Sequence, residues 1–240
     1  MNVLITGVSK GLGLKITESL IKDGWNVFGL SRSKTEKLDS LLNQYPNQLK
    51  WLKHDLSKTK KIRQTIFKDW IGMNTPIHGF VNNAALAYDD IITNLNIDSL
   101  EKMYHVNVFS PMMLTKFVLR QMLLHNTKGS IVHLSSISVH TGYKGLSMYA
   151  STKGALEAFS KNTAREWGEK GVRSNCIVAG FMETEMSSAL SDNQRNRIYK
   201  RTSLKKPVVM SSVAETTRFL LSNEANSITG QNIHVDNGTI

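Results

Sequence analysis

The sequence predicts a single α/β domain: a Rossmann-like, doubly wound sheet of seven mostly parallel strands with helices on both faces. Short apolar runs typical of buried strands alternate with stretches of helical periodicity along the 240 residues. A glycine-rich turn joins the first expected strand to the first expected helix. Neither an internal repeat nor a Pro/Ser-rich linker divides the chain. Residues 1–240 are therefore expected to fold as one domain.

The composition is ordinary for a globular protein and leaves no room for a disulfide framework. Hydrophobic residues make up 40% of the chain and charged residues 20%. Cys176 is the only cysteine, which favours a reducing compartment. The N-terminus lacks the features of a signal peptide, and no apolar run approaches the ~20 residues that span a bilayer. We therefore expect a soluble, cytoplasmic protein without a membrane partner.

The net charge of +11 raises the local concentration of anionic partners such as phosphates, nucleic acid or an acidic protein. Basic clusters occur at residues 58–63 and 200–206. Neither cluster is interleaved with aromatic residues that could stack on bases. A merely basic surface is therefore preferred, and no nucleic-acid partner is expected.

The first strand, turn and helix form half of a mononucleotide-binding unit. Residues 2–6 suit a strand buried on both faces, and the following helix ends at Gly24. Glycines in the turn let the backbone approach a pyrophosphate at the helix N-terminus. The spacing G-x-x-x-G-x-G differs from the common G-x-G-x-x-G, and the turn could be only a tight connection. Its position favours binding, through Gly7, Ser9, Lys10, Gly11, Leu12 and Gly13.

The second strand, residues 25–30, ends in Ser31-Arg32-Ser33. A carboxylate at this place binds the ribose hydroxyl of NAD, whereas an arginine accommodates the extra phosphate of NADP. No carboxylate is present here, and Lys10 adds a second positive charge from the glycine turn. The pair favours NADP(H), although both side chains could be ordinary surface charges.

Helix 34–45, strand 49–53 and helix 57–71 continue the alternation. Asp55 and Leu56 follow the third strand; Asp55 could bind an adenine amino group or cap the next helix. Strand 77–82 ends in four residues of which Asn82 is interpreted as structural and Asn83, Ala84 and Ala85 as lining the cofactor cleft.

A long helix, about 98–125, carries Asn107 within an apolar stripe, where its amide could open the helix and hold a water. The next strand delivers Ser136 to the carboxyl end of the sheet, where ligands of open α/β sheets bind. His133 is expected to face the core and His140 to lie in a loop, both without a catalytic role.

Tyr149 and Lys153 are four positions apart in a helical segment, 147–168, and face the same way. A phenol alone titrates near ~10, and a neighbouring ammonium lowers that pKa toward the working range. The spacing suits a tyrosine that exchanges a proton with a substrate oxygen. A solvated surface pair would show the same spacing, so the motifs in the rest of the chain must decide between a catalytic pair and a surface pair.

The last third of the chain contains strand 172–178, helix 211–222 and a final strand over 228–236. Between them, residues 186–206 are polar and basic without a clear apolar stripe, as expected of a mobile cover over the site. Residues 182–206 are accordingly predicted to cover the substrate.

Taken together, the ordered motifs resemble those of the short-chain dehydrogenase/reductase family over essentially the whole chain, and most closely those of bacterial 3-oxoacyl-[acyl-carrier-protein] reductases. The matching pieces are Thr6–Gly13, Asn82–Ala85, Asn107, Ser136, Tyr149–Lys153 and Ile228–Gly238. The closer resemblance rests on Gly180–Arg195 and the C-terminal strand.

The resemblance implies an NADP(H)-binding and catalytic domain without a metal. Tyr149 would protonate the carbonyl oxygen while a hydride reaches its carbon, and Ser136 would hydrogen-bond that oxygen. Lys153 would bind the nicotinamide ribose and lower the pKa of Tyr149, and Asn107 would hold a water of a proton relay. Three further cofactor contacts are expected at Gly180, Met182 and Thr184.

Three positions depart from the family pattern. Ala85 and Ala179 replace a usual glycine and a usual proline, and Asn237 stands where glycine is common. None of these changes removes a reacting group. Activity is therefore expected, with an altered substrate preference.

The favoured hypothesis is NADPH-dependent reduction of a 3-oxoacyl thioester on acyl carrier protein or coenzyme A, as in fatty acid biosynthesis. An acidic carrier protein suits the basic surface, with Lys128 and Lys170 near expected carrier-binding positions. The alternatives are a sugar, polyol or other ketone substrate, and a non-catalytic cofactor sensor. The resemblance also implies a homotetramer paired through helices 98–125 and 147–168 and through the C-terminal strands.

Overall fold

The computed structural model describes residues 1–184 and 190–239. These residues form one seven-stranded sheet in the order β3-β2-β1-β4-β5-β6-β7, and every pairing is parallel. The strands are β1 (Asn2–Thr6), β2 (Asn26–Ser31), β3 (Leu49–Lys53), β4 (Gly79–Asn82), β5 (Ser130–Ser136), β6 (Arg173–Ala179) and β7 (Asn232–Val235). The predicted α/β fold is confirmed. The strand order reverses between β1 and β4, which places the ligand crevice of such sheets at their carboxyl ends.

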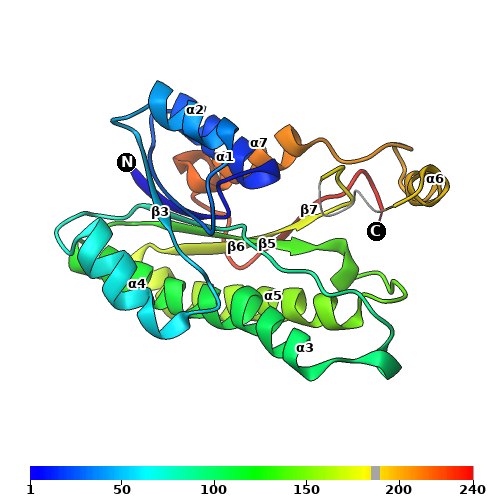
Figure 1. The fold of residues 1–240 in the computed structure, drawn as a ribbon. Helices are drawn as coiled ribbons and strands as arrows, with labels where there is room; N and C mark the ends of the chain where they lie inside the picture. The colour runs from blue at the N-terminus through cyan, green and yellow to red at the C-terminus, as the bar shows by residue number, and fades with distance from the viewer. Residues whose placement is uncertain (185–189, 240) are drawn as a thin grey trace.

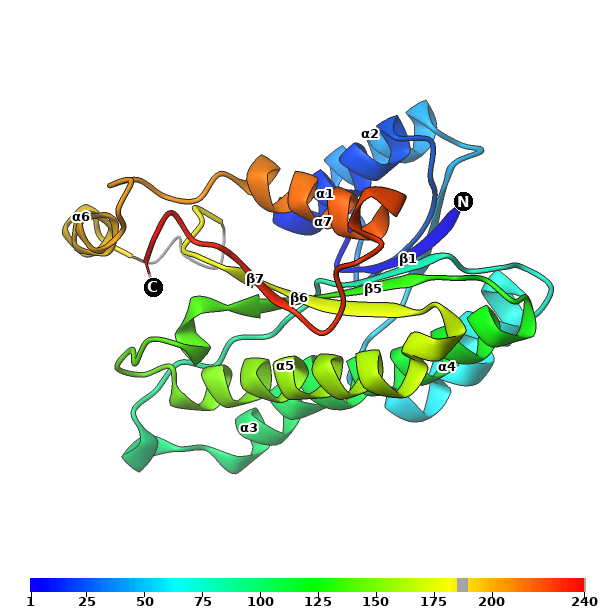
Figure 2. The same cartoon turned by 180° about the vertical axis from the view of Figure 1, so that it is seen from behind.

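Helices cover both faces of the sheet (Figure 1). One layer contains α1 (Gly11–Lys22), α2 (Glu36–Gln44) and α7 (Met210–Leu221). The other contains α3 (Ile97–Tyr104), α4 (Ser110–Leu124) and α5 (Ser147–Trp167), as the view from behind also shows (Figure 2). Short 3-10 turns complete the described connections: η3 (Ile92–Asn94), η5 (Ile137–Val139), η6 (Gly168–Lys170) and η8 (Asn223–Ala225).

Each face of the sheet has its own apolar core because successive residues of a strand point to opposite sides. Ile5 of β1 packs with Ile16 and Leu220 of the α1/α7 layer. Its neighbour Leu4 packs with Leu114 and Val118 of α4. All six side chains are fully buried, and burying one leucine or isoleucine contributes roughly 1.5–3 kcal/mol. The continuous apolar strands therefore hold the two helical layers against one sheet.

Two predicted helices are interrupted. The stretch 98–125 consists of α3, the π-helical turn η4 (His105–Phe109) and α4, and Asn107 lies in the π-helical part. The stretch 57–71 consists of a 3-10 turn, η1 (Thr59–Lys61), and the π-helical η2 (Arg63–Ile71). A π-turn inserts one residue without destroying the apolar stripe, so periodicity alone could not locate either interruption.

The final strand is shorter than predicted. Residues 228–231 form an irregular connection after η8; the Ile228 N–H donates to the Ala225 carbonyl, and the Gly230 N–H donates to the Ser174 carbonyl. Pairing with β6 begins only at Asn232, opposite Cys176. The first part of the predicted strand, residues 228–231, therefore leads to the sheet, and only Asn232–Val235 form the strand.

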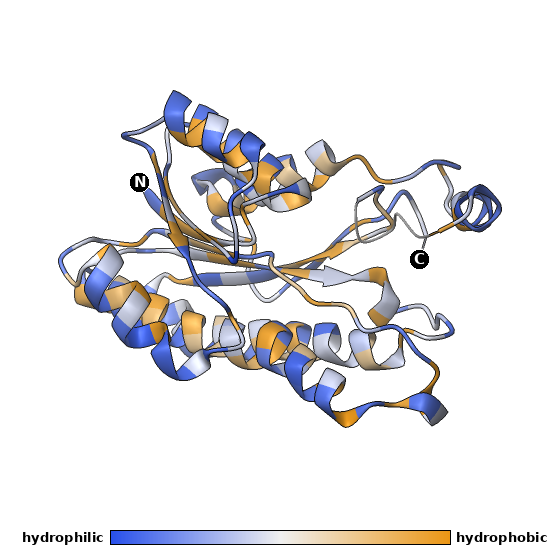
Figure 3. Ribbon diagram, viewed as in Figure 1, coloured by the Kyte–Doolittle hydropathy of each residue, from blue (hydrophilic) through white to orange (hydrophobic). Residues whose placement is uncertain are grey.

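The predicted covering segment contains a helix, α6 (Asp192–Arg201), that the sequence prediction missed. Ser191 and Gln194 form a reciprocal capping box at its start, and none of its residues is buried. Figures 1 and 2 place α6 apart from the two helical layers, and Figure 3 shows it hydrophilic on its visible surface. Residues 185–189 of the segment lie outside the described residues.

None of the helices described in residues 1–184 and 190–239 has the length and apolar character needed to cross a membrane.

Candidate active site

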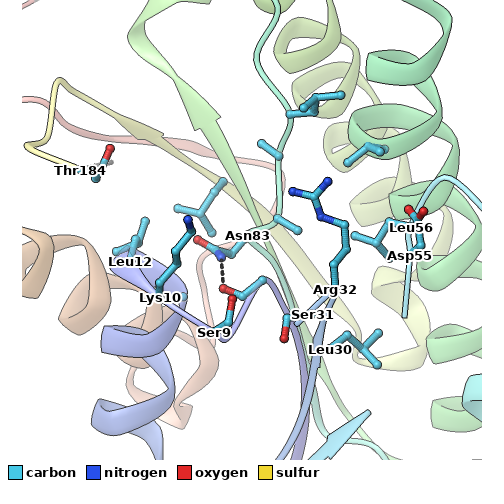
Figure 4. Close-up of a pocket in the computed structure, with 18 of the residues that line it drawn as sticks. Ser9, Lys10, Leu12, Leu30, Ser31, Arg32, Asp55, Leu56, Asn83 and Thr184 are labelled. Atoms are coloured by element: carbon cyan, nitrogen blue, oxygen red, sulfur yellow. Dashed lines mark hydrogen bonds between the residues drawn. The ribbon is translucent and has the colours of Figure 1, made fainter. Parts of the chain in front are cut away.

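A cleft of about 390 Å³ opens at the carboxyl ends of the strands (Figure 4). All predicted cofactor contacts except Gly180 line it: Gly7, Ser9, Lys10, Gly11, Leu12, Gly13, Ser31, Arg32, Asp55, Leu56, Asn83, Ala84, Ala85, Tyr149, Lys153, Met182 and Thr184. The fold thus gathers residues from the whole length of the sequence around one space.

The glycine-rich turn brings the start of α1 against β1 and β4. Gly7 has a φ of +78°, a left-handed conformation that favours glycine. A Cβ atom on Gly13 would lie 2.0 Å from the Gly7 carbonyl oxygen and 2.5 Å from Asn83 Nδ2. No side chain fits there, so the N-terminus of α1, with its unpaired N–H groups, can face the cleft only with glycine at residue 13.

Asn83 and Thr6 hold the turn in place. Asn83 Nδ2 donates to the carbonyl oxygens of Thr6, at 2.9 Å, and Gly7, at 3.3 Å. Thr6 Oγ1 in turn accepts the N–H groups of Asn83 and Ala84. Asn83 therefore lines the cleft and braces it, whereas Asn82 is buried in β4 as a structural residue.

Two cations and one carboxylate line the part of the cleft beside the glycine-rich turn and the end of β2. Lys10, the N-cap residue of α1, and Arg32, which follows β2, both extend into it in Figure 4. Asp55 lies on the far side of Arg32 in that view and accepts the Ser57 N–H at 3.0 Å. This hydrogen bond, assisted by the charges of Lys58 and Arg32, lowers the pKa of Asp55. Asp55 thus binds the following turn while facing the cleft.

Tyr149 and Lys153 meet at the opposite end, on one face of α5. Lys153 Nζ lies 5.6 Å from the centroid of the Tyr149 ring and donates to the Leu134 carbonyl oxygen at 2.8 Å. Lys153 is 2% exposed, and its burial lowers its pKa to about 8. The ammonium can therefore release its proton near neutral pH.

The expectation that Lys153 lowers the pKa of Tyr149 is wrong for this structure. Burial raises the pKa of Tyr149, and the charge of Asp89 raises it further. The Lys153 ammonium lies over the face of the Tyr149 ring. Burial lowers the pKa of Lys153, so less of it carries the positive charge that would stabilise a phenolate. Tyr149 is therefore protonated at neutral pH, as a proton donor must be, while the raised pKa also makes it a weaker acid. Asp89, whose own pKa is raised by burial, was not anticipated from the sequence.

Ser136 lies at the end of β5, immediately before η5. Its Oγ accepts the Ser138 N–H at 3.2 Å and the Ser138 hydroxyl at 3.0 Å. Among the described lining residues of the cleft, Ser135 is included and Ser136 is not. Ser136 thus lies outside the lining of the cleft, between β5 and the connection to Tyr149, and its contact with a substrate oxygen stays a prediction.

Asn107 joins the loop after β4 to α5. Its Oδ1 accepts the Leu86 N–H at 2.8 Å, and its Nδ2 donates to the Leu86 carbonyl at 2.8 Å and to Thr152 Oγ1 at 3.1 Å. The π-turn thus directs the amide across to the residue before Lys153. The water assigned to Asn107 by resemblance stays a prediction.

Gly180 departs from expectation because it packs away from the cleft. A Cβ atom there would lie 2.6 Å from Cα of Asp236, so the residue accommodates the close approach of the C-terminal segment. Lining residues that sequence reasoning missed are Leu30, Ser33, His54, Leu86, Lys102, Val106, Leu134, Ser135 and Ala179. Leu30, Ser135 and Ala179 lie at or next to strand ends, a position that could have identified them.

The described residues contain no group of three or more His, Cys, Asp or Glu side chains arranged to hold a metal ion.

Comparison with known proteins finds similarity along nearly the whole chain. A family model described as enoyl-(acyl carrier protein) reductase matches residues 7–239. The chain is 31% identical to a 3-oxoacyl-[acyl-carrier-protein] reductase of Buchnera aphidicola, over 98% of this chain and 95% of the relative. It is 30% identical, with the same coverage, to the corresponding reductase of Salmonella typhimurium.

Solved structures share the fold. A gluconate 5-dehydrogenase from Burkholderia cenocepacia, in complex with NADP and tartrate, has a TM-score of 0.92 and 23% identity, with 99% of this chain and 94% of that one covered. ElxO with NADP bound has a TM-score of 0.88 and 26% identity, with 99% and 98% covered. A 4-hydroxyisoleucine dehydrogenase complexed with NADH has a TM-score of 0.92 and 23% identity, covering 99% of this chain and 98% of that one.

Proposed function

Because the chain belongs to the short-chain dehydrogenase/reductase family, whose members interconvert ketones and alcohols with NAD(P), we propose that it reduces a 3-oxoacyl thioester with NADPH. The observation that carries the proposal is one continuous cleft with Lys10 and Arg32 at one end and Tyr149 and Lys153 at the other. Such a cleft suits a phosphorylated dinucleotide with its reactive ring beside a proton donor.

The residues of the cleft fit NADPH. Backbone N–H groups at the start of α1 face the place for a pyrophosphate, and Lys10 and Arg32 supply charge for a ribose phosphate. Leu56 and Ala84 offer apolar contact for an adenine, with the Asp55 carboxylate beside it. Bound in this way, the dinucleotide would supply a hydride to the carbonyl carbon.

The chain's own residues would handle the proton. Tyr149, protonated because of its raised pKa, donates the proton to the carbonyl oxygen. Ser136 donates a hydrogen bond to the same oxygen and stabilises its developing negative charge. Lys153, with a pKa of about 8, returns a proton to Tyr149. Asn107 holds the loop at Leu86 against α5 at Thr152, next to the Lys153 that returns the proton.

The pKa of Lys153 gives the two reaction directions opposite pH dependences. Ketone reduction draws on the ammonium form, which is lost as the pH rises through about 8. Alcohol oxidation draws on the neutral amine, which appears over the same range. As the pH rises through about 8, the initial rate of ketone reduction should therefore fall and the initial rate of alcohol oxidation should rise. Parallel pH profiles for the two directions would contradict the role of Lys153.

The substrate part of the proposal rests on the relatives and on charge. The relatives of about 30% identity are reductases of acyl carrier protein thioesters, and a chain of net charge +11 favours an acidic carrier, with Lys128 and Lys170 as candidate contacts. The test measures NADPH consumption with acetoacetyl groups on acyl carrier protein and on coenzyme A, and NADP+ reduction with a panel of sugar acids and polyols, whose alcohol groups can only be oxidised. Turnover of the thioesters alone is expected; exclusive turnover of a sugar acid or polyol favours the second substrate class.

Residues 182–206 are proposed to cover the bound substrate. Tyr199 of α6 donates its hydroxyl to Glu183 Oε1 at 2.5 Å, and Arg195 lies 3.8 Å from the same oxygen. These contacts tie α6 to the segment that carries Met182 and Thr184 in the cleft. A movement of α6 would therefore be transmitted to the nicotinamide end of the site.

A homotetramer is proposed for the assembly, and a cytoplasmic location stays a prediction. Phe109, Leu123 and Leu124 are 46%, 39% and 61% exposed along η4 and α4, the elements expected to pair. Light scattering is expected to give about four times the chain mass of 26.9 kDa, and Leu124→Lys to lower it. A single-chain mass for the unaltered protein would contradict the proposal.

A further inference from the structure

Glu157 is a buried carboxylate on α5 that the catalytic scheme does not use. It is 7% exposed and accepts hydrogen bonds from three different segments of the chain. Asn232 Nδ2 of β7 donates to Oε2 at 2.8 Å, and the Ser135 hydroxyl donates to Oε1. His140 Nε2 lies 3.2 Å from Oε1 and 3.0 Å from Oε2. A buried carboxylate is costly unless it is hydrogen-bonded or paired with a cation. Both oxygens of Glu157 accept hydrogen bonds.

The partners of Glu157 are the neighbours of the proposed catalytic groups. Ser135 directly precedes Ser136 on β5, and His140 lies in the connection between Ser136 and Tyr149. Glu157 itself follows Lys153 by one helical turn, so the two side chains occupy the same face of α5. Figure 2 shows α5 running along the face of the sheet formed by β5, β6 and β7. One carboxylate therefore fixes the end of β5 relative to the helix that carries the proton donor.

The contacts continue to the nicotinamide end of the cleft. The rings of His140 and His234 lie with centroids 5.0 Å apart, and His234 Nδ1 is 4.0 Å from Asp236 Oδ2. Asp236, 7% exposed, packs against Gly180, which leads to Met182. The titratable groups that the described structure places against His140 are thus Glu157 from α5 and His234 from β7, with Asp236 behind His234.

A purely structural role would not require this arrangement. An apolar side chain of similar volume could join α5 to the sheet without the cost of a buried charge. Of the three donors to Glu157, His140 is the one whose side chain can carry a positive charge. Its side chain is 29% exposed, so solvent protons reach it while Glu157 stays buried.

We propose that Glu157 is a positioning residue, which sets Ser136 relative to Tyr149 through Ser135, and that the proton on His140 controls how firmly it does so. Protonated His140 balances the buried carboxylate and holds the connection between Ser136 and Tyr149 against α5. Neutral His140 leaves that charge less balanced, and the connection loosens. This inference rests on the proposed function for the roles of Ser136 and Tyr149.

The test compares Glu157→Gln with Glu166→Gln, a matched change at an exposed carboxylate of the same helix. An amide at residue 157 can no longer accept from all three donors. A misplacement on the order of 1 Å costs about 100-fold in rate, so Glu157→Gln is expected to lower kcat by about 10- to 100-fold. The KM for NADPH should stay within about twofold because the nucleotide contacts are untouched. Glu166→Gln should match the unaltered enzyme.

His140→Gln supplies the pH readout. Glutamine can donate to Glu157 but cannot take up a proton, so any dependence of kcat on the His140 proton should disappear. The separate change near pH 8 from Lys153 should persist. Rates are measured with whichever ketone or alcohol the unaltered enzyme turns over, so failure of the thioester substrates leaves this test intact.

Two results would overturn the inference. One is a folded Glu157→Gln protein, with an unchanged thermal midpoint and unchanged kcat. The other is a His140→Gln protein whose kcat and pH profile equal those of the unaltered enzyme, which decides the matter also if Glu157→Gln does not fold.

Discussion

Tyr149→Phe is expected to lower kcat for NADPH-dependent reduction by about 100- to 10,000-fold, the range that general acid catalysis contributes. The substitution removes one hydroxyl and keeps the ring that contacts Lys153. Because burial holds the phenol protonated, Tyr149 is the group best placed to deliver a proton to the carbonyl oxygen. The KM for NADPH should change little, since the cations that favour the nucleotide lie at the other end of the cleft.

The matched control for this prediction is Tyr104→Phe. Tyr104 shares a hydrogen bond of 2.9 Å with Ser151, on the same helix as Tyr149, but is not part of the cleft lining. Its substitution should leave kcat within about twofold, since it breaks one exposed hydrogen bond. Equal activity of the two variants would show that the chemistry does not depend on Tyr149.

Arg32→Glu is expected to raise the KM for NADPH by about 100-fold and to leave the KM for NADH nearly unchanged. Loss of a charge-assisted hydrogen bond is worth about 1.5–3 kcal/mol, and a tenfold change corresponds to 1.4 kcal/mol. The introduced carboxylate also repels the ribose phosphate and can instead accept from the ribose hydroxyl of NADH. Steady-state kinetics with both cofactors measures the change in preference.

Arg63→Glu is the control for charge alone. Arg63 is exposed on η2 and lies outside the cleft lining, so the same change of net charge should alter KM for NADPH by no more than about threefold, as expected of a screened surface charge. If Arg32→Glu and Arg63→Glu behave alike, the preference for NADPH does not depend on Arg32. The extra phosphate would then depend on Lys10.

The sequence predicts the cleft well because its signals are local. Gly13 is required by a backbone approach within a single turn, and Arg32 and Asn83 follow strands whose apolar runs are continuous. Once the strands are recognised as parallel, their carboxyl ends must meet, which brings these residues together. Tyr149 and Lys153 are likewise visible because helical spacing alone puts them on one face.

The sequence does not predict features that depend on packing between distant elements. The π-turn at Asn107 leaves the apolar stripe intact and so carries no periodic signal. Gly180 resembles a ligand-binding glycine, but Asp236 of the C-terminal segment packs where a side chain at residue 180 would lie. Burial raises the pKa of Tyr149, an effect that the spacing between Tyr149 and Lys153 cannot reveal. In the sequence, Glu157 is one of several carboxylates of its helix. Only the folded structure brings Ser135, His140 and Asn232 into contact with it.

The most direct measurement of the central claim follows the hydride into the product. The purified protein is incubated with acetoacetyl thioester and NADPH carrying deuterium on the nicotinamide, and the product is examined by mass spectrometry. The claim predicts one deuterium on the hydroxyl-bearing carbon of the 3-hydroxyacyl product, at a rate that falls with Tyr149→Phe. Oxidation of NADPH without a deuterated 3-hydroxyacyl product, or transfer that Tyr149→Phe leaves unchanged, would contradict it.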